Sequence, residues 1–249
     1  MSHIARIFVN HPIEAGAAIS LDEGQSRYLM KVMRLSDGAL VRAFNGADGE
    51  WRCTLSTHGK KALITPEVQT RPQDAGPDLT LLFAPIRRTR TELIIEKATE
   101  LGVKTIQPVI TEYTQFNRLR VDRLELLAIE AAEQTERLDL PTIKEPIPFQ
   151  KALSEWPSSN PLIFCDEAGA AAPLSAHVDQ LSGQTCGIFI GPEGGFSSKE
   201  REQLRAMACI VPITLGPRIL RAETAVVSAL TLWQSLVGDW QKAPYLPET

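Results

Sequence analysis

The region that follows Leu79 alternates short apolar runs with longer amphipathic ones. The apolar runs have the length of buried strands, and the stretches between them have helical spacing, as in RTRTELIIEKATELG, where Leu93, Ile94, Ala98 and Leu101 recur on one face. This alternation predicts an α/β domain with a mainly parallel sheet. The predicted strands are LTLLFAPI, TIQPVIT, PLIFCDE, TCGIFIG and IVPITLG, and the final helix is expected from about residue 222 to residue 240.

The first seventy residues show a different pattern. RIFV, ALVRAF and EWRCTL predict short strands, and the NG and DG pairs of FNGADGE predict a hairpin between the last two. SRYLMKVMRL predicts one helix with Leu29, Val32, Met33 and Leu35 on its apolar face. The proline- and glycine-containing stretch RPQDAGPD predicts a linker. We therefore predict a small β-barrel domain at 1–72, a linker at 73–78 and the α/β domain at 79–249.

Charge and composition exclude several classes of protein. The chain has 249 residues, 43% of them hydrophobic, and a net charge of -4; residues 1–72 carry nine basic and seven acidic side chains, and the remainder carries seventeen and twenty-three. A polyanionic partner would therefore have to bind local basic patches. No apolar window approaches ~18 residues, which predicts a cytoplasmic protein with no membrane span. The four cysteines and four histidines lack ligand spacing, which predicts reduced thiols and no metal.

The stretch GPEGGFSSKE directly follows the apolar run GIFI. Ser197 and Glu200 have capping-box spacing, so the stretch predicts a junction from strand to loop to helix. Ligands bind α/β proteins at the carboxyl ends of parallel strands, and glycines allow close approach to the backbone. The loop lacks the spacing of known phosphate-binding loops, and Glu193 favours a cationic or hydroxyl-bearing ligand. A plain tight turn is the alternative interpretation.

A second unusual stretch, LGPRILRAETA, follows the last predicted strand. Gly216 and Pro217 predict a turn, Arg218 and Arg221 lie three residues apart, and Glu223 falls in the first turn of the final helix. Two arginines beside a helix N-terminus indicate a nearby anion, which could be Glu193, Glu223 or a ligand phosphate. The alternative is a turn followed by a charged first helical turn.

Basic residues are clustered in two parts of the chain. Their density suits phosphate contacts, although a lattice of surface salt bridges is an equal alternative for any single residue. The basic clusters are Arg6, Arg27, Lys31 and Arg34 in the first domain, and Arg87, Arg88, Arg90, Arg118, Arg120 and Arg123 in the second.

The acidic residues of the stretch IEAAEQTE are expected to form a solvated helix face.

The chain resembles the bacterial RsmE-type small-subunit ribosomal RNA methyltransferases of the SPOUT class. The resemblance spans the chain and is carried by YLMKVMRL, FNGADGEW, EKATELGV, EAAEQ, IGPEGGFS and LGPRILRAETA, in the family's order. It implies a PUA-like RNA-binding β-barrel followed by an α/β domain threaded as a trefoil knot. It also implies a homodimer that binds S-adenosyl-L-methionine in the knotted loops and methylates N3 of one uridine in 16S rRNA or the small ribosomal subunit.

Candidate residues follow from the basic clusters, from the motif beside the donor pocket and, for the methyl donor, from positions that match the family's motifs. The basic clusters give Arg6, Arg27, Lys31, Arg34, Arg87 and Arg88 as the candidates for RNA contact. Arg221 and Glu223 are the candidates for stabilising the developing anion and accepting the N3 proton. The residues expected to hold the methyl donor are Gly191, Glu193, Gly194, Leu215, Gly216, Ile219, Leu220, Thr224 and Ala225.

Three positions depart from the family pattern. Ile86 stands where a lysine is common, and Tyr113 and Thr114 replace an Arg-Ser pair. The glycine often found after EAAEQ is replaced by Thr135 or Glu136, depending on the alignment. A non-catalytic PUA-type RNA-binding assembly factor is the second hypothesis. A nucleotide-binding oxidoreductase is disfavoured because the phosphate loop is missing.

Overall fold

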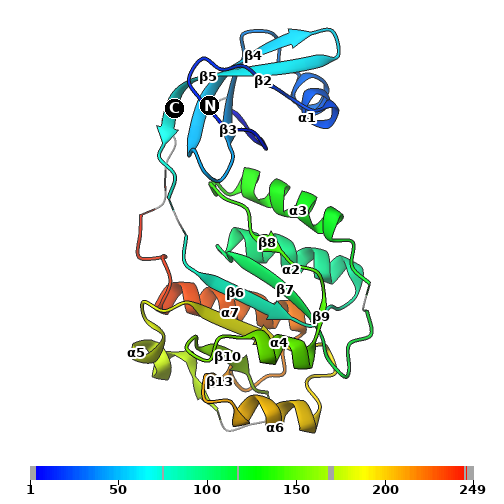
Figure 1. Ribbon diagram of the computed structural model, residues 1–249, viewed down its shortest axis with the longest axis vertical. Helices are drawn as coiled ribbons and strands as arrows, with labels where there is room; N and C mark the ends of the chain where they lie inside the picture. Colours follow the sequence, from blue (N-terminus) through cyan, green and yellow to red (C-terminus); the bar gives the residue numbers. More distant parts are fainter. Residues whose placement is uncertain (1–3, 75, 117, 168–170, 244, 246–249) are drawn as a thin grey trace. The chain divides into compact units, whose positions relative to one another are not determined.

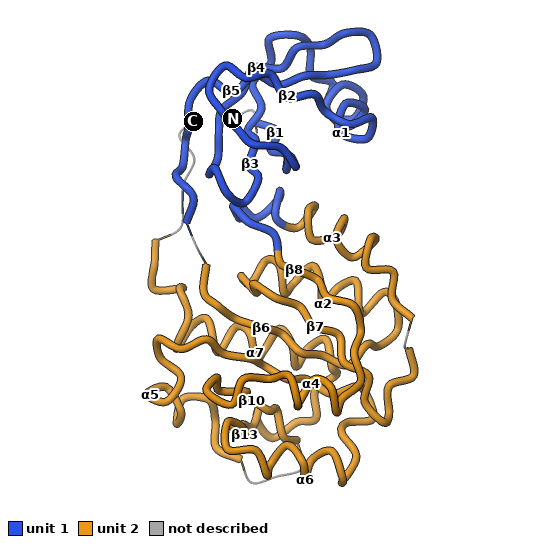
Figure 2. The backbone as a smooth tube through the Cα atoms, in the orientation of Figure 1, with its two compact units in different colours: residues 1–75, 132–140, 245–249 blue, residues 76–131, 141–244 orange. Residues whose placement is uncertain are grey.

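The protein divides into two compact units. The computed structural model describes residues 4–74, 76–116, 118–167, 171–243 and 245. The first unit comprises residues 1–75, 132–140 and 245–249, and the second comprises residues 76–131 and 141–244 (Figure 2). The first unit therefore includes a segment from the middle of the chain. The predicted domain boundary at 73–78 stays a prediction.

The first unit is built on a five-stranded sheet with the order β1-β3-β4-β5-β2 (Figure 1). β1 pairs with β3 in parallel, and the other pairs are antiparallel. The predicted hairpin is confirmed, because β3 and β4 are antiparallel neighbours. Gly49, in the hairpin turn, has a φ of +74°, and a Cβ atom there would lie 2.2 Å from the carbonyl oxygen of Arg71. The strands are β1 (Ala5–Phe8), β2 (Ile19–Ser20), β3 (Leu40–Phe44), β4 (Glu50–His58) and β5 (Lys61–Arg71).

The helix predicted in the first unit has two parts. α1 (Glu23–Arg27) begins with a capping box formed by Asp22 and Gln25, and the chain continues as a π-helix over Tyr28–Val32. The N–H of Met33 donates to the carbonyl of Tyr28, five residues earlier, over 2.9 Å. The wider π turn changes which side chains share a face. Val32, predicted on the apolar face, is 64% exposed.

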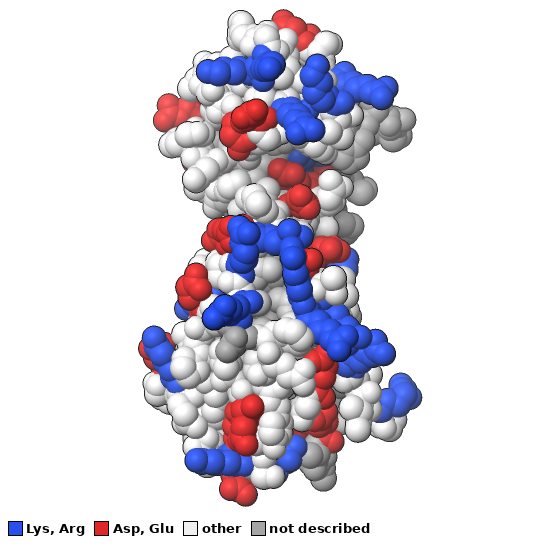
Figure 3. All heavy atoms as spheres, turned by 90° about the vertical axis from the view of Figure 1, so that its right-hand side faces the viewer, with Lys and Arg blue, Asp and Glu red and all other residues white. Residues whose placement is uncertain are grey.

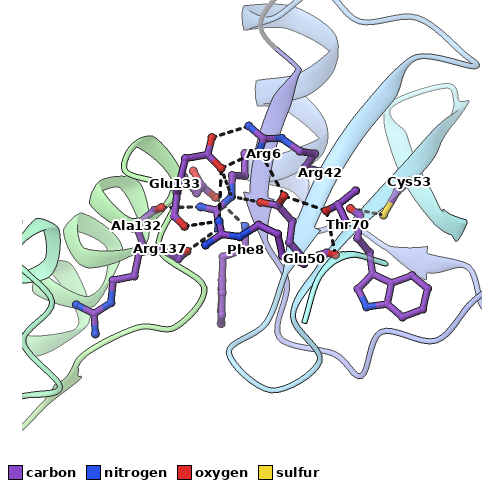
Figure 4. Close-up of polar contacts among 12 residues, drawn as sticks. Arg6, Phe8, Arg42, Glu50, Cys53, Thr70, Ala132, Glu133 and Arg137 are labelled. Carbon is purple, nitrogen blue, oxygen red and sulfur yellow. Dashed lines mark hydrogen bonds and ion pairs between the residues drawn. The ribbon is translucent and has the colours of Figure 1, made fainter. Parts of the chain in front are cut away.

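A buried arginine links the sheet of this unit to residues 132–140 (Figure 4). The Arg6 side chain is only 1% exposed, and its Nε lies 2.6 Å from Oε2 of the fully buried Glu50. Its Nη1 and Nη2 donate to the carbonyls of Ala132 and Arg137, each over 2.6 Å. Burial lowers the pKa of Arg6, and the hydrogen bond and charge of Glu50 oppose that shift. This corrects the prediction of an RNA contact for Arg6, because all three nitrogens are occupied inside the protein.

Two acids of IEAAEQTE belong to the same network. Oε1 of Glu133 accepts from the N–H of Phe8 over 2.9 Å, and Glu136 forms two hydrogen bonds with Arg42, of 2.7 and 2.6 Å. The prediction of a solvated helix face is therefore wrong for both acids. Burial raises the pKa of Glu136, but Arg42, with smaller contributions from Arg6 and Arg71, outweighs burial and holds that pKa below its usual range.

The second unit contains a parallel sheet, as predicted. The strand order is β11-β13-β10-β12-β6-β7-β8, and β9 pairs separately with β7. Every strand pair recorded in this sheet is parallel. The strand order does not test the trefoil knot, which stays a prediction. The strands are β6 (Leu79–Phe83), β7 (Thr105–Ile110), β8 (Thr142–Ile143), β9 (Ile147–Pro148), β10 (Leu162–Cys165), β11 (Ala172–Pro173), β12 (Cys186–Ile190) and β13 (Ile210–Thr214).

Helices cover both faces of this sheet (Figure 1). Leu79, Leu81 and Phe83 of β6 pack in one core with α2, α3 and α7, whereas Leu82 packs in a second core with α4 and α6. Successive side chains of a strand point to opposite faces, so β6 contributes to both cores. The helices are α2 (Arg88–Glu100), α3 (Val121–Gln134), α4 (Phe149–Glu155), α5 (Val178–Leu181), which follows a 3-10 turn (Leu174–His177), α6 (Ser198–Ala206) and α7 (Ala222–Leu236).

Candidate functional site

The first glycine-rich loop leaves the carboxyl end of β12. All five residues of β12 are buried, and the ring of Phe196 packs against the rings of Phe164 and Phe189, with centroids 5.3 and 4.9 Å apart. A Cβ atom at Gly191 would lie 2.9 Å from the Phe196 ring, so glycine at this position allows the ring to pack closely against the loop backbone. The predicted capping box is confirmed, because Ser197 and Glu200 exchange hydrogen bonds at the start of α6.

The second loop leaves the carboxyl end of β13. The N–H of Gly216 donates to Oγ1 of Thr214 over 3.1 Å, and Gly216 has a φ of +100°. A residue with a Cβ atom would be strained in that conformation. Arg221 occupies the N-cap position of α7 without a capping hydrogen bond from its side chain. The turn thus leads directly into the final helix.

The two loops wall one cavity of about 260 Å³. In the sheet, β10 lies between β12 and β13, and all three strands are parallel, so their carboxyl ends meet at one edge. Seven of the residues predicted to hold a methyl donor line this cavity: Gly191, Glu193, Leu215, Gly216, Ile219, Leu220 and Ala225. Gly194 and Thr224 are not among the lining residues, and a Cβ atom at Gly194 would lie 3.3 Å from Cβ of Tyr113.

The sequence interpretation missed the contribution of β10 to the cavity. Cys165, Asp166 and Glu167 line it at the end of this strand, and Phe196 lines it from the first loop. Asp166 is buried and forms an ion pair with Arg205. The signal was present in PLIFCDE, because two acids directly follow an apolar strand. Only the strand order, which the sequence does not reveal, places them between the two loops.

The acids of the two loops share one arginine. Oε1 of Glu193 lies 3.4 Å from Nη1 of Arg90, and Oε1 of Glu223 lies 3.5 Å from Nε of the same side chain. The sequence left Glu193, Glu223 and a ligand phosphate as alternatives for neutralising Arg218 and Arg221, which both lie exposed. In the described parts of the chain, the ion pairs of Glu193 and Glu223 are instead with Arg90, on α2.

The remaining basic candidates differ from Arg6 in exposure. Arg27, Lys31 and Arg34 are exposed on the first unit, and Arg34 has a φ of +55°. Arg87 and Arg88 are exposed at the start of α2, where Arg88 pairs with Glu92 over 2.9 Å. Figure 3 shows basic side chains interspersed with acidic ones on the surface of each unit. Both original interpretations, RNA contact and surface salt bridge, therefore remain applicable to these five residues.

Among the residues that the structure describes, no group of three or more His, Cys, Asp or Glu side chains could hold a metal ion. Within the same residues, no helix has the length and apolar character needed to cross a lipid bilayer.

Two family models match the chain. Residues 74–234 match a family described as an RNA methyltransferase domain, and residues 21–66 match an RNA methyltransferase PUA domain. Together with the parallel sheet and its loop-walled cavity, these matches define an RNA methyltransferase with an N-terminal PUA-like domain. A relative named ribosomal RNA small subunit methyltransferase E, from Rickettsia conorii, is 34% identical over 90% of this chain and 93% of its own. The chain belongs to the family of ribosomal RNA small subunit methyltransferase E.

Further relatives cover most of the chain. A protein of the same name from Synechocystis is 32% identical over 89% of this chain and 74% of its own. The crystal structure of a ribosomal RNA small subunit methyltransferase E from Neisseria gonorrhoeae, bound to S-adenosyl methionine, has a TM-score of 0.84 and 29% identity. That match covers 96% of this chain and 100% of the other. The similarity therefore includes both units.

Proposed function

We propose that this protein is an S-adenosyl-L-methionine-dependent methyltransferase that modifies N3 of a uridine in 16S rRNA, as a cytoplasmic homodimer. The observation that carries the proposal is the cavity between the two glycine-rich loops. Relatives of the chain are named for small-subunit ribosomal RNA, and the similar Neisseria gonorrhoeae structure is described as bound to S-adenosyl methionine. The N3 position comes from the family resemblance.

The cavity residues fit such a methyl donor. Leu215, Leu220 and Ile190 offer apolar walls for an adenine ring. The carboxylates of Glu167 and Glu193 line the same cavity and suit a ligand that carries positive charge. Gly191 and Gly216 also line the cavity and contribute only backbone atoms to its wall. The donor would supply the methyl group as an activated sulfonium substituent.

The chain's own residues must then position the acceptor uridine and remove its N3 proton. Arg221 is exposed at the N-terminus of α7, where it could stabilise negative charge on the base. Glu223 follows two residues later, and its side chain is only 13% exposed. Its Oε2 is buried and has no hydrogen-bond partner among the described residues, so a proton taken up by this oxygen would break no existing hydrogen bond. Neither side chain lines the donor cavity.

The direct test is calorimetric titration with S-adenosyl-L-methionine, followed by methylation of small ribosomal subunits from a strain that lacks the gene. We expect donor binding and a new N3-methyluridine that mass spectrometry maps to one site in 16S rRNA. Free 16S rRNA is the parallel substrate, which distinguishes naked RNA from the assembled subunit. Absence of donor binding at millimolar concentration would instead support the non-catalytic RNA-binding assembly factor.

The catalytic candidates are tested by Arg221→Ala and Glu223→Ala. Both variants should lower turnover far more than donor affinity, because the two side chains lie outside the cavity lining. Single-turnover methylation and donor titration measure the two effects separately. An equal loss of turnover and donor affinity would contradict the catalytic assignment and indicate that both residues only hold the loop.

A further inference from the structure

Arg90 connects three segments that are distant in the sequence. It lies in the first turn of α2, after β6, and its side chain is 32% exposed. Its Nη1 lies 3.4 Å from Glu193 in the loop that follows β12. Its Nε lies 3.5 Å from Glu223 in the first turn of α7. One guanidinium therefore contacts an acid of the first loop and an acid at the start of α7, the helix that directly follows the second loop.

The two acids need a shared counter-charge. Glu193 and Glu223 each lie within 3.5 Å of the same side chain, so without a cation between them their carboxylates would repel each other. Glu223 is also largely buried, and a buried carboxylate is costly unless it is paired. In the described part of the chain, Arg90 is the cation that forms an ion pair with either acid. Its loss would leave both carboxylates without this counter-charge.

We propose that Arg90 is a positioning residue that holds the first loop of the donor cavity to the start of α7, where the second loop ends, by pairing one carboxylate from each. This role rests on the proposed methyltransferase function. Arg90 does not line the cavity, so it acts on the donor only through Glu193 and Glu223. By fixing Glu223, it also sets the direction of the carboxylate that is proposed to accept the N3 proton.

The shape of the guanidinium is part of the inference. Different nitrogens serve the two acids, Nη1 for Glu193 and Nε for Glu223. A planar fork can pair with two carboxylates at fixed positions, whereas the lysine ammonium is a single point on a flexible stem. Arg90→Lys therefore keeps the charge and loses the bridge, and Arg90→Ala loses both.

The test compares Arg90→Ala and Arg90→Lys with the wild type in donor titration and in single-turnover methylation of small subunits. We expect Arg90→Ala to weaken donor binding about tenfold, and to lower saturated turnover by about a further tenfold, because Glu223 is no longer held. Arg90→Lys should lose at least about fivefold in donor affinity. Lys97→Ala is the matched control, because Lys97 lies on the same helix and its ion pairs with described residues are local, with Glu96 and Glu100.

Two further measurements separate positioning from folding. Millimolar guanidinium ion should restore part of the turnover of Arg90→Ala, whereas a folding defect would not respond. In a protein that also carries Glu193→Gln and Glu223→Gln, Arg90→Ala should change donor affinity by less than about twofold, because the partners through which it acts have lost their charge.

The possible outcomes distinguish the inference from the proposed function. If the wild type binds donor and methylates subunits while both Arg90 variants match it within twofold, the positioning role is overturned and the methyltransferase function stands. If Arg90→Lys alone matches the wild type, the bridging geometry is overturned. If the wild type binds no donor, the proposed function fails, and the positioning role fails with it.

Discussion

Glu136 provides a test of how the first unit balances buried charge against backbone strain. Its carboxylate lies 2.6 Å from Arg42, 3.7 Å from Arg6 and 3.8 Å from Arg71, and the side chain is 27% exposed. Breaking a fully buried pair costs about 3–5 kcal/mol, and partial exposure lets water replace some of that interaction. We therefore expect Glu136→Gln to lower the free energy of unfolding by about 2–3 kcal/mol.

The backbone of Glu136 makes an opposite contribution. Its φ is +61°, a conformation that disfavours any side chain with a Cβ atom. Replacing a non-glycine residue by glycine there should recover about 1 kcal/mol. Glu136→Gly should therefore be about 1 kcal/mol more stable than Glu136→Ala, although both lose the carboxylate. The three variants thus separate the charge from the backbone.

The assay is urea unfolding at pH 7, combined with hydrogen exchange of peptides from β3 and β4, which reports the first unit alone. The difference in the free energy of unfolding between the wild type and Glu136→Gln should also decrease as the pH falls. The pKa of Glu136 is lowered in the folded protein, so its stabilising effect is present above the unfolded pKa of about 4.3 and is lost as the pH falls through the folded pKa. Equal stability of Glu136→Gln and the wild type would refute the ion-pair argument, and equal stability of the Ala and Gly variants would refute the backbone argument.

Three other predictions concern the first unit. Lys31→Ala should weaken RNA binding and reduce the slope of log K against log salt concentration by about one. Filter binding at several salt concentrations measures this slope, and an unchanged slope would show that Lys31 does not contact RNA phosphates. Gly49→Ala should lower the free energy of unfolding in urea by more than about 3 kcal/mol, because the new Cβ would meet the Arg71 backbone. Gly59 is also at positive φ but faces open space, so Gly59→Ala should lower it by about 1 kcal/mol. Equal losses in the two variants would contradict the steric argument. Burial raises the pKa of Cys53 to about 12, so above pH 8.5 the unfolded thiol ionises first and stability should fall by about 1.4 kcal/mol per pH unit towards pH 12. Burial raises the pKa of Cys165 to about 12 as well, so the Cys53 contribution is the difference between the wild type and Cys53→Ala in urea unfolding. The stability of the wild type relative to Cys53→Ala should fall with this slope, and parallel pH profiles for the two proteins would refute it.

Features that depend on neighbouring residues were predictable from the sequence. The FNGADGE hairpin and the capping box of Ser197 and Glu200 are specified within a few residues, and both are present. The five main strands of the parallel sheet also matched, since each is a short apolar run between helical stretches. The π-helix at Tyr28–Val32 was missed because the apolar spacing there also fits an ordinary helix.

Features that depend on distant partners were not predictable. Arg6 looked like a surface cation, but its partners Ala132 and Arg137 lie more than 120 residues away in the sequence. Glu193 and Glu223 were two of the three anions considered for neutralising Arg218 and Arg221, and both pair instead with Arg90. Charge complementarity required a partner in each case. Only the fold determines which arginine or carbonyl is close enough to provide it.

The discontinuity of the first unit limits how it can be moved between proteins. A gene fragment that ends at residue 72 would encode Arg6 and Glu50 without the carbonyls of Ala132 and Arg137 that accept from two nitrogens of Arg6. It would also lack Leu138, which packs beside Phe44. Recombination at residue 72 would therefore transfer the five-stranded sheet with two nitrogens of the buried Arg6 left without their carbonyl partners. A transplant that also includes residues 132–140, joined to the first segment by a new connection, is the smallest exchange that preserves the contacts of Arg6 and Phe44.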